Sequence, residues 1–182
     1  MGIAAMVAFH LSLAARIRGT ILMRKPWLLS SLALFLMFAP AQESLPPGFD
    51  QWTNASLKSF AAKMHEDAAH DPHHFSVEQL ADYPHDSSLW VHREGDGAVE
   101  WHKTQADVFF VQSGSATLLV GGTMVNAETV GPDEKRNGSI RGGTRVNLSP
   151  GDVVRIPPRV PHQVLLEGSP EFNYFVIKIK NY

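Results

Sequence analysis

From residue 89 to the C-terminus, the sequence consists of short apolar runs with alternating polar residues, separated by turns that contain glycine. Successive side chains of a strand point to opposite faces, so runs of this kind predict half-buried strands. We expect strands near residues 89–94, 98–102, 107–113, 115–120, 124–127, 144–148, 152–156, 162–167 and 172–180. Because these strands are many and short, and no helices alternate with them, the predicted fold class is all-β, as a sandwich or barrel.

The segment from residue 42 to residue 84 has a different pattern. Gln42 to Asp50 contains a Pro-Pro-Gly sequence and is expected to be a linker. A helix is predicted to follow, capped by Asn54 or Ser56 and running to about Ala69. Its buried stripe is expected to consist of apolar residues at helical spacing, namely Leu57, Phe60, Ala61 and Met64.

Two shorter segments also carry local signals. Ser76 to Leu80 begins with a capping-box pattern, which predicts one short helical turn. Val130 to Ser139 is polar and contains a proline and a glycine, which predicts a longer, mobile loop.

Residues 1–41 resemble a secretory signal rather than part of a folded domain. Met23 to Lys25 is a short basic start, and Trp27 to Phe38 is an apolar run too short for a comfortable membrane span. Ala39-Pro40-Ala41 has the small-x-small pattern of a cleavage site, so we expect cleavage after Ala41 and a periplasmic or secreted product. The alternative is an uncleaved signal anchor. Residues 1–22 are interpreted as an upstream extension, because Met23 is the natural start of such a signal.

Composition narrows the function further. The formal net charge of -2 gives no electrostatic case for binding nucleic acid. The chain has no cysteine, which excludes disulfides, thiolate metal sites and a cysteine nucleophile, and its 9 histidines mildly favour metal chemistry or pH-sensitive behaviour. We therefore expect three parts: a signal segment (1–41), a linker and helical segment (42–84) and a β-barrel domain (85–182).

Four polar side chains occupy positions where neighbouring strands could bring them together. Glu100 and His102 are two residues apart and leave the same face of a strand, Asp107 opens the next apolar run, and His162 follows a proline-rich corner. Buried at one end of an apolar barrel, these groups would be costly without a compensating cation. They predict a divalent metal site. The alternative is that the carboxylates are surface ions and the imidazoles are satisfied core residues.

The spacing of these residues resembles the first sequence motif of the cupin family. That motif has a glycine, two histidines two apart, a glutamate and a later glycine. Glu100 takes the place of the first histidine, His102 that of the second and Asp107 that of the glutamate, while Gly114 ends the motif. The opening glycine is displaced by one position, to Gly95.

The second cupin motif has a closer counterpart. Gly151, Pro157 and His162 match it in type and spacing, whereas Arg159 replaces the family's glycine and Leu166 its asparagine. The resemblance covers roughly residues 85–180. It implies a jelly-roll β-barrel with a metal pocket, preceded here by the short helical region, and it implies that cupin relatives pair as homodimers through sheet edges. It does not select one reaction, because this fold carries many chemistries.

The resemblance and the donor types together suggest which ion would bind. Two imidazoles and two carboxylates are a harder set than the family's usual three histidines and one glutamate, so Fe2+ and Mn2+ rank ahead of Zn2+ and Ni2+. Asp107 is shorter than glutamate and is expected to reach the metal directly or through water. Glu100 is either a ligand or a general base. Gln105 is a candidate to support the ligands from behind.

Other residues are candidates to face a substrate. His92 and Tyr174 are candidate catalytic groups, Arg93 and Arg155 could hold an anion, and Lys178 shares a strand face with Tyr174. For each of them a structural or solvated role is the simpler interpretation.

Two further groups are expected to lie outside the pocket. Trp101 is expected to cover the outer face of its strand, beneath the Leu57–Met64 helix. The histidines of the predicted helix end and turn are interpreted as solvated rather than metal-binding: His70, His73 and His74.

Three functions are consistent with these observations. The first is an exported metal-dependent enzyme of oxygenase, isomerase or lyase type that acts on a small organic molecule. The second is a non-catalytic cupin that binds a small ligand or a metal. The third is an interaction domain tethered to the membrane by residues 1–38, the membrane otherwise being contacted only through the signal segment.

Overall fold

The structure is a computed structural model that describes residues 44–182. The predicted signal segment, its cleavage site and the upstream extension lie outside these residues. Within the described part of the chain, no helix has the length and apolar character needed to cross a membrane. The elements are α1 (Asn54–Ala69), β1 (Phe75–Asp82), β2 (Asp86–Arg93), β3 (Glu100–His102), β4 (Ala106–Gly114), β5 (Ala116–Val120), β6 (Thr123–Val125), β7 (Glu128–Gly131), β8 (Glu134–Arg136), β9 (Ser139–Arg141), β10 (Thr144–Leu148), β11 (Val153–Ile156), β12 (His162–Leu165) and β13 (Phe172–Ile179).

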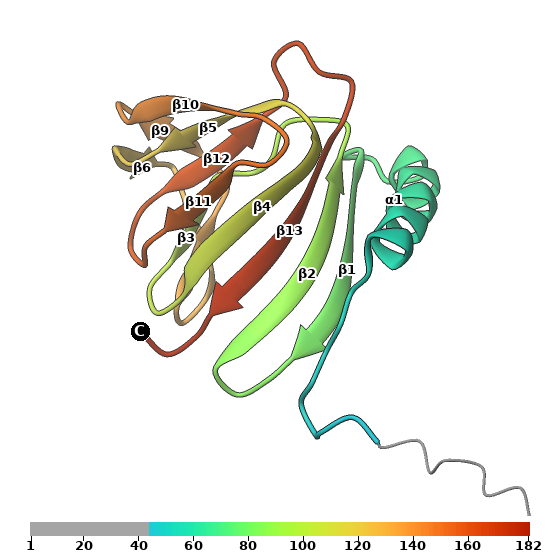
Figure 1. The fold of residues 1–182 in the computed structure, drawn as a ribbon. Helices are drawn as coiled ribbons and strands as arrows, with labels where there is room; N and C mark the ends of the chain where they lie inside the picture. Colours follow the sequence, from blue (N-terminus) through green and yellow to red (C-terminus); the bar gives the residue numbers. More distant parts are fainter. Residues whose placement is uncertain (1–43) are drawn as a thin grey trace, which may run out of the picture. The chain divides into compact units, whose positions relative to one another are not determined.

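Two antiparallel sheets form the body of the described domain (Figure 1). The five-stranded sheet has the order β1-β2-β13-β4-β11, and the six-stranded sheet has the order β10-β5-β12-β3-β8-β7. Strands β6 and β9 pair separately. The predicted all-β class is therefore confirmed, but within residues 44–182 the two sheets are not joined into one closed barrel.

The core lies between the two sheets. Alternation turns Phe109 and Val111 of β4, Val164 of β12, and Phe172 and Val176 of β13 inward, and each is at most 4% exposed. Burying one such side chain contributes about 1.5–3 kcal/mol relative to leaving it in water. The predicted alternation holds for β4 and β12.

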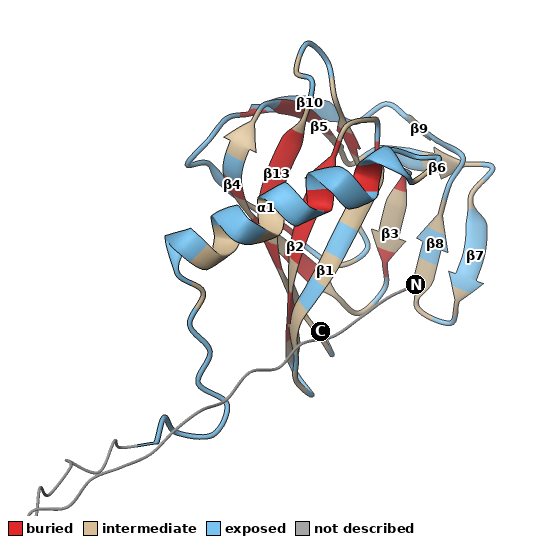
Figure 2. Ribbon diagram, turned by 90° about the vertical axis from the view of Figure 1, so that its right-hand side faces the viewer, coloured by how far each residue is buried: buried red, intermediate tan, exposed pale blue. Residues whose placement is uncertain are grey.

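Helix α1 packs on the outer face of β1 and β2 (Figure 2). Its cap is Thr53 rather than either predicted residue, Asn54 or Ser56, and the Thr53 side chain accepts a hydrogen bond from the backbone N–H of Ser56 at 3.1 Å. Met64 and Ala68 are fully buried on the face of the helix that packs against the sheet, so the apolar stripe extends one turn further than predicted. The other predicted stripe residues are half-buried: Leu57, Phe60 and Ala61.

Two predictions from local pattern are wrong. Ser76 to Leu80 is not a helical turn but part of β1, which pairs with β2 along its whole length and is contacted by α1. The segment from Val130 to Ser139 is not a long loop, because the end of β7, all of β8 and the start of β9 lie within it and β8 pairs with β3. In both cases pairing with a strand distant in the sequence outweighs the local signal.

Trp101 also lies elsewhere than expected. Its ring is on the outer face of β3 in the six-stranded sheet, where Lys135 Nζ lies 5.2 Å from the ring centroid. Helix α1 covers β1 and β2 of the other sheet, so it does not cover Trp101. The alternation rule places a side chain on a face but does not say which element covers that face.

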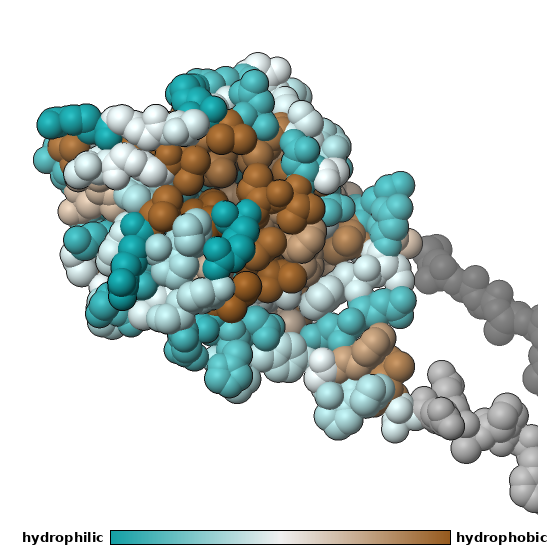
Figure 3. All heavy atoms as spheres, turned by 60° about the vertical axis from the view of Figure 1, so that its left-hand side comes forward, coloured by the Kyte–Doolittle hydropathy of each residue, from teal (hydrophilic) through white to brown (hydrophobic). Residues whose placement is uncertain are grey.

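The edge strands of both sheets carry exposed valines. Val77 on β1, Val153 on β11, Val146 on β10 and Val130 on β7 are each between 36% and 58% exposed. Figure 3 shows that on the face it draws, hydrophobic residues gather centrally and hydrophilic residues surround them. Exposed apolar edge strands are the kind of surface that pairs with another chain, and the homodimer stays a prediction.

Candidate metal centre

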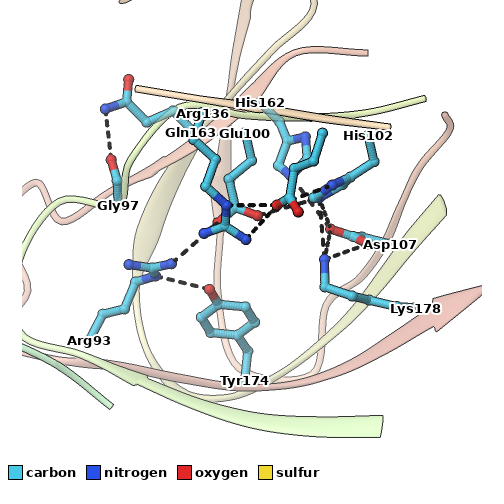
Figure 4. A network of polar contacts seen from close by, with 11 residues as sticks. Arg93, Gly97, Glu100, His102, Asp107, Arg136, His162, Gln163, Tyr174 and Lys178 are labelled. Carbon is cyan, nitrogen blue, oxygen red and sulfur yellow. Dashed lines mark hydrogen bonds and ion pairs between the residues drawn. The ribbon is translucent and has the colours of Figure 1, made fainter. Parts of the chain in front are cut away.

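Four residues from three strands converge at one place between the sheets (Figure 4). Glu100 and His102 are the two ends of β3, Asp107 is the second residue of β4, and His162 is the first residue of β12. His162 pairs directly with Glu100 across the β12–β3 ladder. Each of the four offers one ligand atom, and these atoms all lie within 4.8 Å of one another. The structure thus brings together the residues that the strand pattern and spacing had linked.

The centre is buried and tightly spaced. His102 Nε2 lies 3.3 Å from Asp107 Oδ2 and 3.4 Å from Glu100 Oε2, and His162 Nε2 lies 3.5 Å from Asp107 Oδ2. His102, Asp107 and His162 are each at most 5% exposed, and the Glu100 side chain is 16% exposed. The alternative that both carboxylates are surface ions is wrong.

A hydrogen bond at Nδ1 fixes the orientation of the His162 ring. His162 Nδ1 lies 3.1 Å from the backbone oxygen of Val160, which can only accept a hydrogen bond. The proton of a neutral His162 is therefore on Nδ1, and the lone pair of Nε2 faces Asp107. A lone pair aimed at a carboxylate is the arrangement expected of a metal ligand held by a backbone carbonyl.

Lys178 places a positively charged side chain in this centre. Its Nζ donates to both oxygens of Asp107 at 3.0 Å and lies 3.2 Å from His102 Nε2. The sequence placed Lys178 on the same strand face as Tyr174 but gave no sign of the Asp107 contact. In β13 both residues belong to the alternation that turns Phe172 and Val176 into the core, so strand period was the available signal.

Two arginines flank Glu100. Arg93 Nη2 lies 3.9 Å and Arg136 Nη1 lies 3.7 Å from Glu100 Oε1, and Arg136 Nε also donates to Glu134 at 2.6 Å. Sequence analysis missed Arg136 because it lies in the segment expected to be a loop. In β8 it stands directly opposite Glu100.

The charges fix the ionisation of the centre. Burial by itself raises the pKa of Glu100, but the hydrogen bond with His102 and the charges of Lys178 and Arg136 outweigh it and lower this pKa to about 2. Burial also opposes ionisation of Asp107, yet the contact with His102 and the Lys178 charge hold the pKa of that carboxyl well below its usual range. Burial lowers the pKa of His102, and the two carboxylates outweigh this effect and raise it. Both acids are therefore ionised near neutral pH.

A cavity of about 170 Å³ opens beside the carboxylates. Its apolar wall includes Leu89, Val91 and Phe109, and its polar wall includes Tyr174 and Lys178 together with Arg93 and Arg136. Tyr174 is buried, its hydroxyl accepts a hydrogen bond from Arg93 Nε at 3.0 Å, and burial raises its pKa. A larger hollow of about 490 Å³ lies elsewhere, at Trp101, Met124 and Arg159, and does not include the four candidate ligands.

Two candidate substrate-facing residues lie away from this cavity. His92 was expected to line the pocket, but it is next to Arg93 on β2 and therefore points to the opposite, helix-covered face, where it is 1% exposed. Arg155 is exposed on β11 and its guanidinium donates to the hydroxyl of Tyr182. Neither residue can contact a molecule in the cavity. Gln105 lies with His102 and Glu134 around a separate small hollow.

Arg159 occupies the position where the cupin motif has glycine. Its φ is 65°, in the left-handed region that glycine adopts without strain, and its backbone N–H donates to the backbone oxygen of His102 at 2.7 Å. The turn before β12 therefore holds a non-glycine residue in a conformation that glycine adopts more readily. This hydrogen bond ties the turn to His102.

No family model matches the chain, and no curated protein matches it. Solved structures that are similar to it include a cupin superfamily protein from Desulfitobacterium hafniense, with a TM-score of 0.42, 14% identity, and coverage of 59% of this chain and 78% of that one. A RmlC-like cupin with a double-stranded β-helix fold from Methanocaldococcus jannaschii has a TM-score of 0.43, 15% identity, and coverage of 61% and 84%.

A DMSP lyase from Ruegeria pomeroyi has a TM-score of 0.42, 16% identity, and coverage of 58% of this chain and 46% of that one. At identities this low, neither a substrate nor a reaction carries over to this chain.

Proposed function

We propose that this chain is an exported cupin-type protein that binds a divalent metal ion between its sheets and acts as a metal-dependent enzyme on a small anionic organic molecule. The observation that supports this most directly is the convergence of four ligand atoms within 4.8 Å, beside a cavity whose lining includes Arg93, Arg136 and Lys178. Catalysis of oxygenase, isomerase or lyase type is the class that such a centre and cavity would serve.

The donor set fits a divalent ion. In its neutral form His162 presents the lone pair of Nε2 to the cluster, and both carboxylates are held ionised by their surroundings. Glu100, His102, Asp107 and His162 would hold the ion, with Fe2+ or Mn2+ favoured by the two oxygens and two nitrogens. When bound, such an ion polarises a carbonyl, activates water or binds dioxygen.

The cavity favours a compact substrate with a negative charge. A volume of about 170 Å³ accepts only a small molecule, and Arg93 and Arg136 point at the space beside Glu100. Their guanidinium groups would pair with a carboxylate of the substrate, while the apolar wall would hold its hydrocarbon part.

Two groups are placed to move a proton. The Lys178 ammonium and the Tyr174 hydroxyl both line the cavity. We propose that Lys178 Nζ exchanges a proton with the substrate, and that Arg93 orients Tyr174 Oη toward the same space. Excluding water from this buried space would strengthen each of these contacts.

A second candidate is a non-catalytic protein that binds a small anion without a metal. The contact of Lys178 with both oxygens of Asp107 favours it, because an ammonium group already compensates that buried carboxylate. In that case Arg93 and Arg136 would bind the anion and no bond of the ligand would change.

The two candidates are separated by turnover. The purified protein, loaded with Fe2+ or Mn2+, would be incubated with a panel of short aliphatic and aromatic carboxylates, and products and oxygen uptake would be measured. We expect turnover of at least one compound, and Arg136→Met to raise its KM by roughly tenfold or more because a guanidinium–carboxylate pair is lost. The matched control is Arg141→Met, which replaces an exposed arginine of β9 and should leave KM unchanged.

Turnover by neither metal form, with binding of the same compounds, would instead support the non-catalytic role. Export is tested separately by N-terminal sequencing of the mature protein. A new N-terminus after Ala41 is expected, and an intact N-terminus in the membrane fraction would support the tethered alternative.

A further inference from the structure

A second group of metal-binding side chains lies on the other face of the five-stranded sheet, where helix α1 packs. His65 comes from α1, His92 from β2, and Glu171 from the residue before β13, and their ligand atoms lie within 4.8 Å of one another. Glu94, just after β2, contacts both imidazoles. We refer to His65, His92, Glu94 and Glu171 as the helix–sheet cluster. The alternation of β2 separates this cluster from the centre described above, because His92 and Arg93 point to opposite faces.

The tautomer of His92 follows from its neighbours. The Asn173 amide nitrogen donates to Ser113 Oγ at 3.0 Å and to Glu171 Oε1 at 3.3 Å. The Asn173 oxygen is therefore the atom that faces His92 Nδ1, at 2.8 Å, and it must accept a proton from that nitrogen. In a neutral His92 the proton is on Nδ1 and the lone pair is on Nε2.

That lone pair points at a carboxylate. His92 Nε2 lies 3.2 Å from Glu94 Oε1, and His92 is only 1% exposed. Two acceptors facing each other in a buried place need a proton or a cation between them. The amide of Asn173 holds the imidazole from behind in the same way that outer-shell groups hold metal-binding histidines.

His65 completes the set from the helix. Its Nδ1 lies 2.6 Å from the same Glu94 oxygen, its ring meets the His92 ring edge-on at 5.6 Å, and its side chain is 64% exposed to solvent. Two imidazoles and a carboxylate form a donor set that Zn2+ shares with Fe2+ and Mn2+, and Zn2+ is the probe of choice because it has no redox chemistry. A hollow of about 290 Å³, lined by Ala61, Ala62 and Glu171, gives access from solvent.

We propose that the helix–sheet cluster binds a divalent metal ion, for which Zn2+ is the probe, and that this ion fastens helix α1 to the five-stranded sheet. His65 and His92 would supply the nitrogens, and Glu171 with Glu94 the oxygens. Since the ligands come from α1, from the end of β2 and from the start of β13, the ion would link the helix to two neighbouring strands. The site is independent of any metal in the centre between the sheets.

The test is Zn2+ stoichiometry in the full chain, measured by calorimetric titration, with the absorption of bound Co2+ as a second readout. His65→Ala removes an exposed side chain and leaves the sheet intact, and His70→Ala, one turn on at the end of the same helix, is the matched control. We expect wild type and His70→Ala to bind one ion more per chain than His65→Ala. Zn2+ should raise the unfolding midpoint of wild type more than that of His65→Ala.

His162→Ala separates this site from the centre between the sheets. We expect His162→Ala to keep the ion that His65→Ala loses, whether or not the other centre binds metal. Equal stoichiometry in wild type and His65→Ala would overturn the proposal, as would a His162→Ala protein that binds no Zn2+. A His65→Ala protein that loses an ion while Zn2+ leaves the wild-type midpoint unchanged would refute the fastening role.

Discussion

Lys178 makes opposite predictions for stability and for metal binding. In the structure its ammonium is the direct partner of Asp107, which is 2% exposed. Removing one partner of a buried ion pair costs about 3–5 kcal/mol, and the lower end applies because Lys178 itself is 19% exposed. We therefore expect Lys178→Met to lower the free energy of unfolding by about 3 kcal/mol, or ~10 °C in the unfolding midpoint for a domain of this size.

A divalent ion would supply the positive charge beside Asp107 that Lys178→Met removes. The ammonium and the ion would compete for the same carboxylate, and two like charges about 4 Å apart repel by a few kcal/mol even at an effective dielectric constant of about 20. Lys178→Met should therefore bind Mn2+ more tightly than wild type by roughly tenfold or more. Added Mn2+ should restore most of the lost stability.

The assay is urea unfolding in EDTA and in Mn2+, together with a Mn2+ titration. Lys63→Met, which removes an exposed ammonium paired with Glu78, is the control and should change neither quantity appreciably. An unchanged midpoint in EDTA would show that the Asp107 contact does not stabilise the protein. A weaker Mn2+ affinity would show that Lys178 supports the metal rather than competing with it.

Two further predictions concern acid stability and the β4–β13 junction. The pKa of Glu100 is about 2 in the folded protein and near 4.5 when unfolded, so the stability that its ionised form contributes is present above pH 4.5 and falls by about 3 kcal/mol as the pH drops toward 2. Asp107 acts in the same direction. A free energy of unfolding, measured with urea in EDTA, that does not change between pH 4.5 and pH 2 would contradict this prediction. Gly114 has φ +74°, and an added Cβ would lie 2.0 Å from the Glu171 backbone oxygen. Gly114→Ala should therefore lower the free energy of unfolding by more than about 2 kcal/mol, and clearly more than Gly168→Ala, because Gly168 has φ +84° but open space around its Cβ position. Equal losses of stability in the two variants would show that backbone strain alone, and not the clash with Glu171, determines the cost.

Strand alternation and motif spacing were enough to assemble the candidate centre. Glu100 and His102 were predicted to share a face because they are two residues apart, and His162 because it opens a run after a proline corner. The face on which each side chain lies follows from the spacing of residues within a strand, whichever strands pair. The residues that compensate the centre were not foreseen, because Lys178 and Arg136 reach it through pairings with strands far away in the sequence.

His92 shows where the same rule stops. Alternation separates His92 from its neighbour Arg93, but it does not say which of the two faces looks into the cavity and which is covered by α1. The missed strands have a similar cause. β1 is an edge strand stabilised by β2 and the helix, and β7 and β8 are too short to show a period.

The central claim is that one cation is held by Glu100, His102, Asp107 and His162 between the sheets. It is tested most directly by elemental analysis of Mn2+-loaded protein in which His65→Ala has removed one ligand of the helix–sheet cluster. One Mn2+ per chain is expected in this background, with the same value after His73→Ala and a large loss after His102→Ala or His162→Ala. Full occupancy after both of the last two substitutions would contradict the claim.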